Sequence, residues 1–139
     1  SIKDEYKRLI KKEKYFNNGR HLEYYSKKKK QIKFELNILN GKRHGTYKSF
    51  YENGQIKINS NYINGVLDGS YRHYYENGQI QSQGNYNYNG SDIYSRKDGI
   101  WKYYYENGKI ESESIIKNGV EELKFYDKEG NLLPEREGC

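Results

Sequence analysis

A seven-residue motif recurs along this chain and constrains the fold more than any other feature. It reads Phe-Tyr-Glu-Asn-Gly-Gln-Ile at residues 50–56 and returns with few changes at 74–80 and 104–110. Looser copies occupy 24–32 and 125–132. Repetition with a period of about 20–50 residues is typical of an array of similar supersecondary units. The aliphatic residues that end the copies are spaced by 24, 24, 30 and 22 positions: Ile32, Ile56, Ile80, Ile110 and Leu132.

Each copy predicts a β-hairpin. Asn-Gly flanked by alternating residues is the strongest short-range indication of a hairpin, because both residues accept the positive φ of a type I′ turn. With Asn53-Gly54 as a two-residue loop, Tyr51 would face Ile56 across the strands. The same register pairs Ser49 with Ile58, Tyr47 with Ser60, Phe50 with Lys57, Tyr75 with Ile80, Tyr71 with Gly84, Tyr105 with Ile110, Trp101 with Ser114 and Lys102 with Glu113.

Two further markers flank the motif. A glycine and, two residues later, an aromatic residue precede it at 45–47, 69–71 and 99–101. A second Asn-Gly pair closes the units at 40–41, 64–65 and 118–119. Each unit therefore contains two turns, and stacked units would extend one antiparallel sheet in which each contacts mainly its neighbours.

Composition supports a thin sheet. Hydrophobic residues make up only 33% of the chain, and 17 residues are Tyr, whereas Met is absent. A two-layer globular core needs more aliphatic residues than this, yet disordered chains have few aromatics. The expected fold is mainly all-β: an elongated, twisted antiparallel sheet of tandem hairpins of about 24 residues.

The chain divides into three expected parts. Residues 1–17 form a basic N-terminal segment, in which Asp4 to Lys14 has the near-helical spacing of a short amphipathic helix or, alternatively, of a degenerate strand pair. Residues 18–133 hold about five repeats, and 134–139 form a tail. Two irregularities interrupt the array: a lysine tip at 27–30 and an insertion within 85–98, which we expect to form a loop.

Charge is distributed unevenly. Residues 1–48 contain 15 Lys and Arg against 5 Asp and Glu, a balance of +10, whereas residues 49–139 contain 10 against 14, a balance of −4. The basic half could meet nucleic acid, anionic lipid or an acidic protein, or it could simply be solvated. The acidic half opposes a continuous track for phosphate groups.

These motifs resemble the MORN repeat in its bacterial variant form, over roughly residues 18–133. That pattern has Gly-x-Trp/Tyr, then Tyr-Tyr-x-Asn-Gly-x-aliphatic and a closing Asn-Gly, and residues 69–78 and 99–108 follow it closely. Proteins built from these repeats are similar to the YwqK-type antitoxin family, whose members are thought to neutralise a cognate toxin by binding it. The resemblance implies a bacterial toxin–antitoxin or immunity protein that acts through protein–protein interaction.

Residues that would indicate catalysis are not grouped. His21, His44 and His73 occupy no common repeat position, and no metal-ligand spacing connects them. The only cysteine, Cys139, is the last residue. The glutamates of the repeats stand beside turns, where polar residues are expected. We therefore predict a protein that is not an enzyme and needs no cofactor, metal or small-molecule substrate.

The leading hypothesis is a protein-binding module, an antitoxin that would act in the cytoplasm. Alternatives are an envelope-associated scaffold, exported through a leader removed before Ser1, and an electrostatic binder of anionic lipid or nucleic acid through residues 1–48. Because the first aromatic of each doublet should point away from the ladder-forming second Tyr, it is the predicted anchor, with the 85–98 insertion as rim. The candidate partner-binding residues are Phe50, Tyr74, Tyr104, Tyr88, Tyr94 and Arg96.

Overall fold

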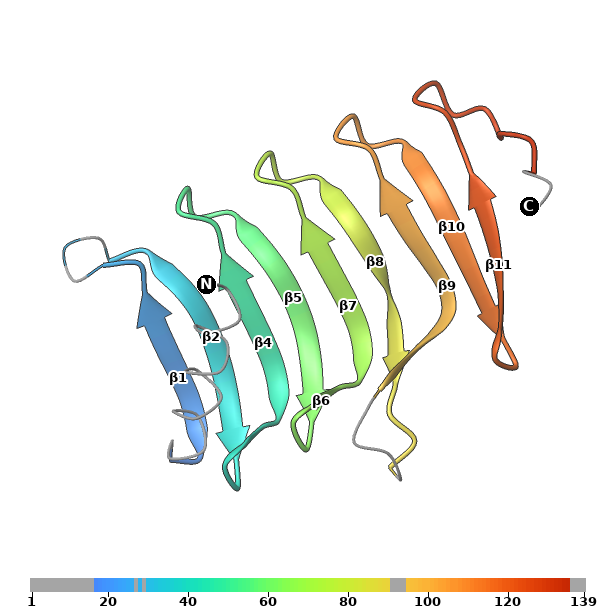
Figure 1. Cartoon of the computed structure of the whole chain (residues 1–139). Helices are drawn as coiled ribbons and strands as arrows, with labels where there is room; N and C mark the ends of the chain where they lie inside the picture. Colours follow the sequence, from blue (N-terminus) through green and yellow to red (C-terminus); the bar gives the residue numbers. More distant parts are fainter. Residues whose placement is uncertain (1–16, 27, 29, 91–94, 136–139) are drawn as a thin grey trace, which may run out of the picture.

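All strands that the structure describes belong to one antiparallel sheet (Figure 1). The computed structural model describes residues 17–26, 28, 30–90 and 95–135. The strands are β1 (Gly19–Tyr24), β2 (Ile32–Leu39), β3 (Lys42–Arg43), β4 (Gly45–Phe50), β5 (Ile56–Ile63), β6 (Val66–Leu67), β7 (Gly69–Tyr74), β8 (Ile80–Asn87), β9 (Arg96–Tyr104), β10 (Ile110–Lys117) and β11 (Val120–Phe125).

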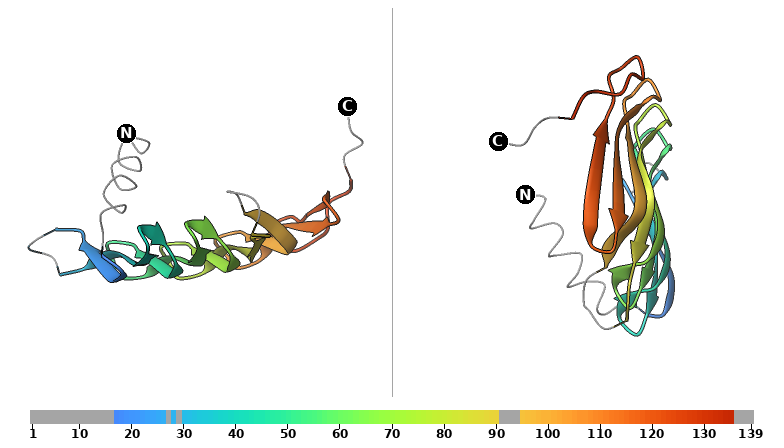
Figure 2. Two further views of the ribbon diagram at one scale, coloured as in Figure 1. Left: turned by 90° about the horizontal axis from the view of Figure 1, so that it is seen from below. Right: turned by 90° about the vertical axis from the view of Figure 1, so that its right-hand side faces the viewer.

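The long strands follow one another in chain order across the sheet. β1, β2, β4, β5, β7, β8, β9, β10 and β11 are successive neighbours, and the short β3 and β6 pair with β2 and β5. Seen edge-on, the strands form a single twisted layer (Figure 2). The all-β, tandem-hairpin fold predicted from the repeat is confirmed. The described residues include no helix long and apolar enough to cross a membrane.

The two kinds of Asn-Gly form different turns. At the closing pairs, both residues have positive φ, 45° at Asn64 and 84° at Gly65, which is the two-residue type I′ geometry. At Asn53-Gly54 only the glycine has positive φ. There Gly54 N donates to Tyr51 O and Tyr51 N donates to Gln55 O, so the loop has three residues, 52–54. The predicted type I′ turn at Asn53-Gly54 is therefore wrong.

The three-residue loop also shifts the register beside it. Phe50, not Tyr51, faces Ile56, and Lys57 has no opposite residue because the ladder resumes at Ser49 and Ile58. One extra residue on one strand is a β-bulge. The same correction replaces the predicted Tyr75–Ile80 and Tyr105–Ile110 pairs by Tyr74–Ile80 and Tyr104–Ile110.

Beyond the bulge, the predicted register is confirmed. The confirmed pairs are Ser49 with Ile58, Tyr47 with Ser60, Tyr71 with Gly84, Trp101 with Ser114, and Lys102 with Glu113. An equivalent bulge occurs in each of the first four hairpins, at Lys33, Lys57, Gln81 and Glu111.

Alternation along the strands gives the sheet two unlike faces. On one, which we call the packed face, Phe34, Leu36 and Ile38 of β2 are buried and Tyr47 packs against them. Further along the same face, the Trp101 ring is 1% exposed and lies within 6 Å of the Tyr71 and Tyr86 rings, with centroid distances of 5.7 and 4.9 Å. Aromatic rings thus supply the core that a single layer otherwise lacks.

A glycine makes room for the largest of these rings. A Cβ on Gly84 would lie 2.2 Å from Cδ2 of Trp101, far inside contact distance. The register partner of Gly84 is Tyr71, but the ring that fills the space belongs to Trp101 of the next strand, β9.

The insertion does not form a loop throughout. Residues 85–87 belong to β8 and 96–98 belong to β9, where Asn85 pairs with Asp98 and Asn87 with Arg96. The expected loop is thus shorter than 85–98, because the extra residues lengthen the hairpin between the two strands. The predicted helix at Asp4 to Lys14 lies outside the described residues, as does part of the lysine tip.

Candidate functional site: the doublet stripe and the tyrosine ladder

The second tyrosine of each doublet connects neighbouring hairpins. Its hydroxyl donates to the carbonyl oxygen of the first aromatic residue in the next hairpin. The donor–acceptor distance is 2.6 Å from Tyr51 Oη to Tyr74 O and 2.6 Å from Tyr75 Oη to Tyr104 O. Tyr25 donates to Phe50 O, and Tyr105 donates to Tyr126 O at 2.8 Å. These four bonds form what we call the tyrosine ladder.

The turn asparagines repeat the same connection two residues further along. Asn53 Nδ2 donates to Glu76 O at 3.1 Å, and Asn77 Nδ2 donates to Glu106 O at 3.3 Å. The Oδ1 atom of Asn53 also accepts from Gln55 N at 2.9 Å, which holds its own turn. Most of the repeated Tyr-Glu-Asn-Gly motif is therefore used to link one hairpin to the next.

The last copy ends the ladder. Tyr126 faces Leu132 and accepts from Tyr105, so it takes the place of the first aromatic rather than of the second. Asp127 then stands where the second Tyr would be, and its amide donates to Asn131 O across the turn. In the looser copy at 125–132, the register therefore places Tyr126, rather than Phe125, at the position of the first aromatic.

The first aromatic of each doublet has a different environment. Strand alternation places Phe50, Tyr74 and Tyr104 on the face opposite the packed face, which we call the polar face. Their side chains are half-buried and each stands opposite the isoleucine after the turn. We call these three residues the doublet stripe. As predicted, they lie on the other face from the residues that form the core.

Charged and polar side chains flank the doublet stripe along the middle of the polar face. Register places Lys48 opposite Glu35, Arg72 opposite Asn59, and Lys102 opposite Glu113. Tyr104 is tied to this row, because Gln83 Nε2 donates to its hydroxyl at 2.7 Å. The stripe is therefore a periodic aromatic feature at the border of an otherwise polar surface.

The predicted rim residues are separated from the stripe. The turns beside Phe50, Tyr74 and Tyr104 lie at one end of the strands. Tyr88 follows β8, at the opposite end of the strands (Figure 1). Tyr88 is half-buried, and its amide donates to Asp68 Oδ1 at 3.0 Å. Arg96 is exposed at the start of β9. Tyr94 lies outside the described residues.

The bulge residues form a row on the packed face that sequence analysis missed. Lys33 Nζ lies 5.9 Å from the centroid of the Tyr25 ring, and Lys57 Nζ lies 5.6 Å from that of Tyr51. These are cation–π distances. In the next two hairpins the same positions hold Gln81 and Glu111. The row therefore changes from basic to acidic along the sheet.

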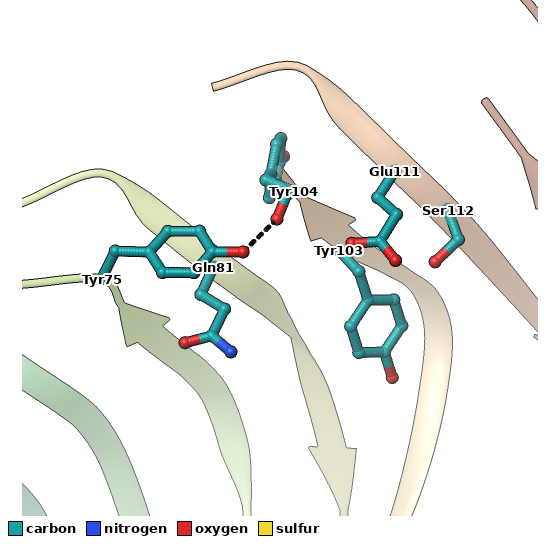
Figure 3. Close-up of a pocket in the computed structure, with 6 residues that line it drawn as sticks. All are labelled: Tyr75, Gln81, Tyr103, Tyr104, Glu111 and Ser112. Atoms are coloured by element: carbon teal, nitrogen blue, oxygen red, sulfur yellow. Dashed lines mark hydrogen bonds between the residues drawn. The ribbon is translucent and has the colours of Figure 1, made fainter. Parts of the chain in front are cut away.

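A shallow hollow opens where that row loses its lysines. It has a volume of about 250 Å³ and lies between the third and fourth hairpins (Figure 3). The residues that line it are Tyr75, Gln81, Tyr103, Tyr104, Glu111 and Ser112.

Burial affects several titratable groups of the packed face. It raises the pKa of Tyr71 to about 12, with nearby tyrosines adding to the effect. Burial also raises the pKa of Tyr75, and the Glu111 and Glu106 carboxylates raise it further. The pKa of His73 is lowered, first by burial and then by the charge of Lys57. In the part of the chain that the structure describes, no three His, Cys, Asp or Glu side chains gather as metal ligands.

The fold and these links define a tandem hairpin-repeat protein of one layer. Three of its segments, residues 43–64, 67–88 and 97–118, match the family described as MORN repeat variant. The three segments begin in β3, β6 and β9, respectively. Each segment contains one complete three-residue turn. The chain therefore contains MORN repeats, and that part of the predicted resemblance is confirmed.

Two other comparisons add less. A search of curated proteins found no match to the chain. Among ten matching chains of solved structures is a mutant of TarM from S. aureus, in complex with fondaparinux, alpha-GlcNAc-glycerol and UDP. The match is 14% identical, covers 84% of this chain and 26% of that chain, and has a TM-score of 0.34. This chain thus spans about a quarter of the length of that protein.

Proposed function

We propose that the chain is a non-enzymatic protein-binding module that acts as an antitoxin, neutralising a cognate toxin in the cytoplasm by binding it through the doublet stripe. MORN repeats are generally binding modules, which supports the coarser part of this proposal. The finer part is supported by the resemblance to antitoxins built from the same repeats. One observation carries the assignment of the surface: only the first aromatic of each doublet is left over from the ladder.

The doublet separates stability from recognition. The second Tyr uses its hydroxyl to bond the next hairpin, so its side chain is committed to the fold. The first aromatic contributes its backbone carbonyl to the same bond, which any residue could supply. Nothing in the ladder requires a ring at Phe50, Tyr74 or Tyr104. Their repeated aromatic character therefore supports a role outside the ladder.

The spacing and surroundings of the stripe suit a protein surface. Successive stripe residues are two strands apart, about 9–10 Å. Aromatic rings are the most frequent anchors in protein interfaces, and the energetically important ones are surrounded by polar groups that exclude water. On the polar face, Arg72 and Lys102 supply charged neighbours for such a rim.

The test is binding to the product of a neighbouring toxin-like gene. The wild-type chain should co-purify with that product and protect cells that express it. Replacing Tyr74 and Tyr104 by Ser should weaken binding by about thirtyfold to several-hundredfold, because interface aromatics each contribute about 1–2 kcal/mol. The matched control is Thr46→Ala, an exposed change near the opposite edge that keeps the carbonyl accepting from Asn37.

The outcomes separate the competing functions. Failure to bind the toxin-like product, or no protection of cells, would contradict the antitoxin proposal. Binding that survives the double Ser variant but falls steeply with added salt would instead favour the electrostatic binder. Binding to an envelope protein through the stripe would favour the scaffold.

A further inference from the structure

We infer that the hollow between the third and fourth hairpins binds a basic side chain, arginine or lysine, from the protein partner. The inference rests on the proposed function only in that the partner is a protein. The inferred site lies on the packed face and would select a positively charged side chain, whereas the doublet stripe lies on the polar face. The hollow would therefore be a second contact with the same partner.

The repeats themselves show what this position accommodates. In the first two hairpins, the ring of the ladder tyrosine has an ammonium group near it, from Lys33 at 5.9 Å and from Lys57 at 5.6 Å. Both lysines occupy the bulge position of their hairpin. The chain thus fills these two positions with its own cations, and the geometry favours a cation near the ring.

The third hairpin keeps the ring and lacks the cation. Its bulge residue is Gln81, and among the described residues no Lys or Arg side chain lies over the Tyr75 ring. The hollow of about 250 Å³ lies beside that ring, and Tyr103 lines it together with Tyr104, whose backbone carbonyl accepts from the Tyr75 hydroxyl (Figure 3). Because a water molecule takes up about 30 Å³, this space has room for a guanidinium or ammonium group with some of its hydration.

The fourth hairpin adds the counter-charge. Glu111 occupies its bulge position and lines the hollow together with Ser112. Its carboxylate acts on Tyr75, since it is a cause of the raised pKa of that hydroxyl, after burial. With the amide oxygen of Gln81 and the hydroxyl of Ser112, the hollow offers three kinds of acceptor beside an aromatic ring. Arginine presents five N–H donors and lysine presents three, so either matches this set.

The test uses a small probe and needs no partner. N-acetyl-arginine N-methylamide is titrated into the isotope-labelled chain at low salt, and the amide signals of Gln81, Glu111 and Ser112 are followed by NMR. N-acetyl-citrulline N-methylamide has nearly the same shape without the charge. We expect the arginine probe to shift these signals in a saturable way and the citrulline probe to shift them far less.

Two variants assign the effect to the hollow. Glu111→Gln should weaken the arginine probe about threefold to tenfold, the size expected for a partly exposed charge contact. Gln81→Lys should abolish binding, because the chain would then supply its own ammonium as Lys57 does. The control is Glu122→Gln, which removes an exposed carboxylate from the polar face of β11 and should leave the titration unchanged.

The opposite results would overturn the inference. Equal shifts with citrulline, unchanged affinity in Glu111→Gln, or full binding by Gln81→Lys would each show that the hollow does not select a cation. These results would leave the proposed function intact if the Tyr74 and Tyr104 variants still lost the toxin. Conversely, a specific arginine site with no toxin binding would refute the proposed function alone. The far-ultraviolet circular dichroism of each variant verifies that the sheet has formed.

Discussion

The two edges of the sheet hold their hairpins together in different ways. The three-residue turns 52–54, 76–78 and 106–108 lie at one end of the strands, and we call the border of the sheet that they form the ladder edge. Side chains from each of these turns bond the backbone of the next turn. At the other edge, the short-turn edge, lie the two-residue turns 40–41, 64–65 and 118–119. There the links to neighbouring hairpins come from backbone amides, as when Gly65 N donates to Arg43 O at 2.8 Å, rather than from the asparagine side chains of the turns.

This difference explains where the repeat is regular and where it varies. The insertion that lengthens one spacing to 30 residues connects β8 to β9 at the short-turn edge. A longer hairpin at that edge leaves the ladder bond from Tyr75 to Tyr104 in place at 2.6 Å. The side-chain bonds that repeat from each turn to the next demand constant geometry at the ladder edge, whereas the turns of the short-turn edge are linked through backbone amides such as Gly65 N.

The largest effect should come from removing the asparagine side chains of the ladder edge. Replacing Asn53, Asn77 and Asn107 together by Gly eliminates six hydrogen bonds, three within the turns and three between them. At about 0.5–1 kcal/mol for each bond, the free energy of unfolding should fall by about 3–6 kcal/mol. Urea unfolding followed by circular dichroism measures this change.

The short-turn edge supplies the matched control. Asn40, Asn64 and Asn118 have φ of 52°, 45° and 52°, a region that glycine adopts without strain. The triple change of these residues to Gly makes the unfolded chain equally more flexible but removes none of the six bonds. It should cost about 1 kcal/mol or less in total. Equal losses at the two edges would disprove the distinction between them.

Sequence reasoning recovered the fold but missed this distinction. Both kinds of Asn-Gly look alike in sequence, but the type I′ geometry predicted for Asn53-Gly54 is wrong there and occurs instead at Asn64-Gly65. One interaction that accompanies the three-residue turn is the bond from Asn53 Nδ2 to Glu76 O, which joins residues 23 positions apart. Local turn preferences cannot report a contact that forms only when two hairpins lie side by side.

The same limit applies to the candidate sites. Alternation predicted that Phe50 and Tyr74 point away from the core, because a period of two needs only the sequence. The hollow at Gln81 and Glu111 could not be predicted, because the bulge turns these residues out of the alternation. In retrospect, the lysines at 33 and 57, at the same repeat position, were an available indication. Tyr88 and Arg96 were grouped with the stripe because a loop position alone does not specify an edge.

A single hydroxyl group tests the tyrosine ladder with a smaller effect. Tyr75→Phe removes the 2.6 Å bond to Tyr104 O and nothing else from the ring. The free energy of unfolding should fall by about 0.5–1.5 kcal/mol. The control is Tyr74→Phe in the same doublet, which should be nearly neutral because the preceding hairpin carries Phe50 at that position. If both variants lost the same stability, the two tyrosines would not have separate roles.

The smallest expected effect concerns the end of the ladder edge, where an acid replaces the phenol. Asp127 Oδ1 accepts from the amides of Glu129 and Asn131 at 3.0 and 2.8 Å, and the bonds with Asn131, above all its amide, lower the pKa of the Asp127 carboxyl. Because the folded pKa lies below the ordinary 3.8, this stabilisation is present above pH 3.8 and is lost as the pH falls through the lower value.

Hydrogen exchange of the Asn131 amide should therefore show less protection in acid, relative to pH 6, than the equivalent Gln55 amide in an asparagine-held turn. Asp127→Asn should make the two turns respond alike to pH, whereas an unchanged acid response would place its origin elsewhere in the last hairpin.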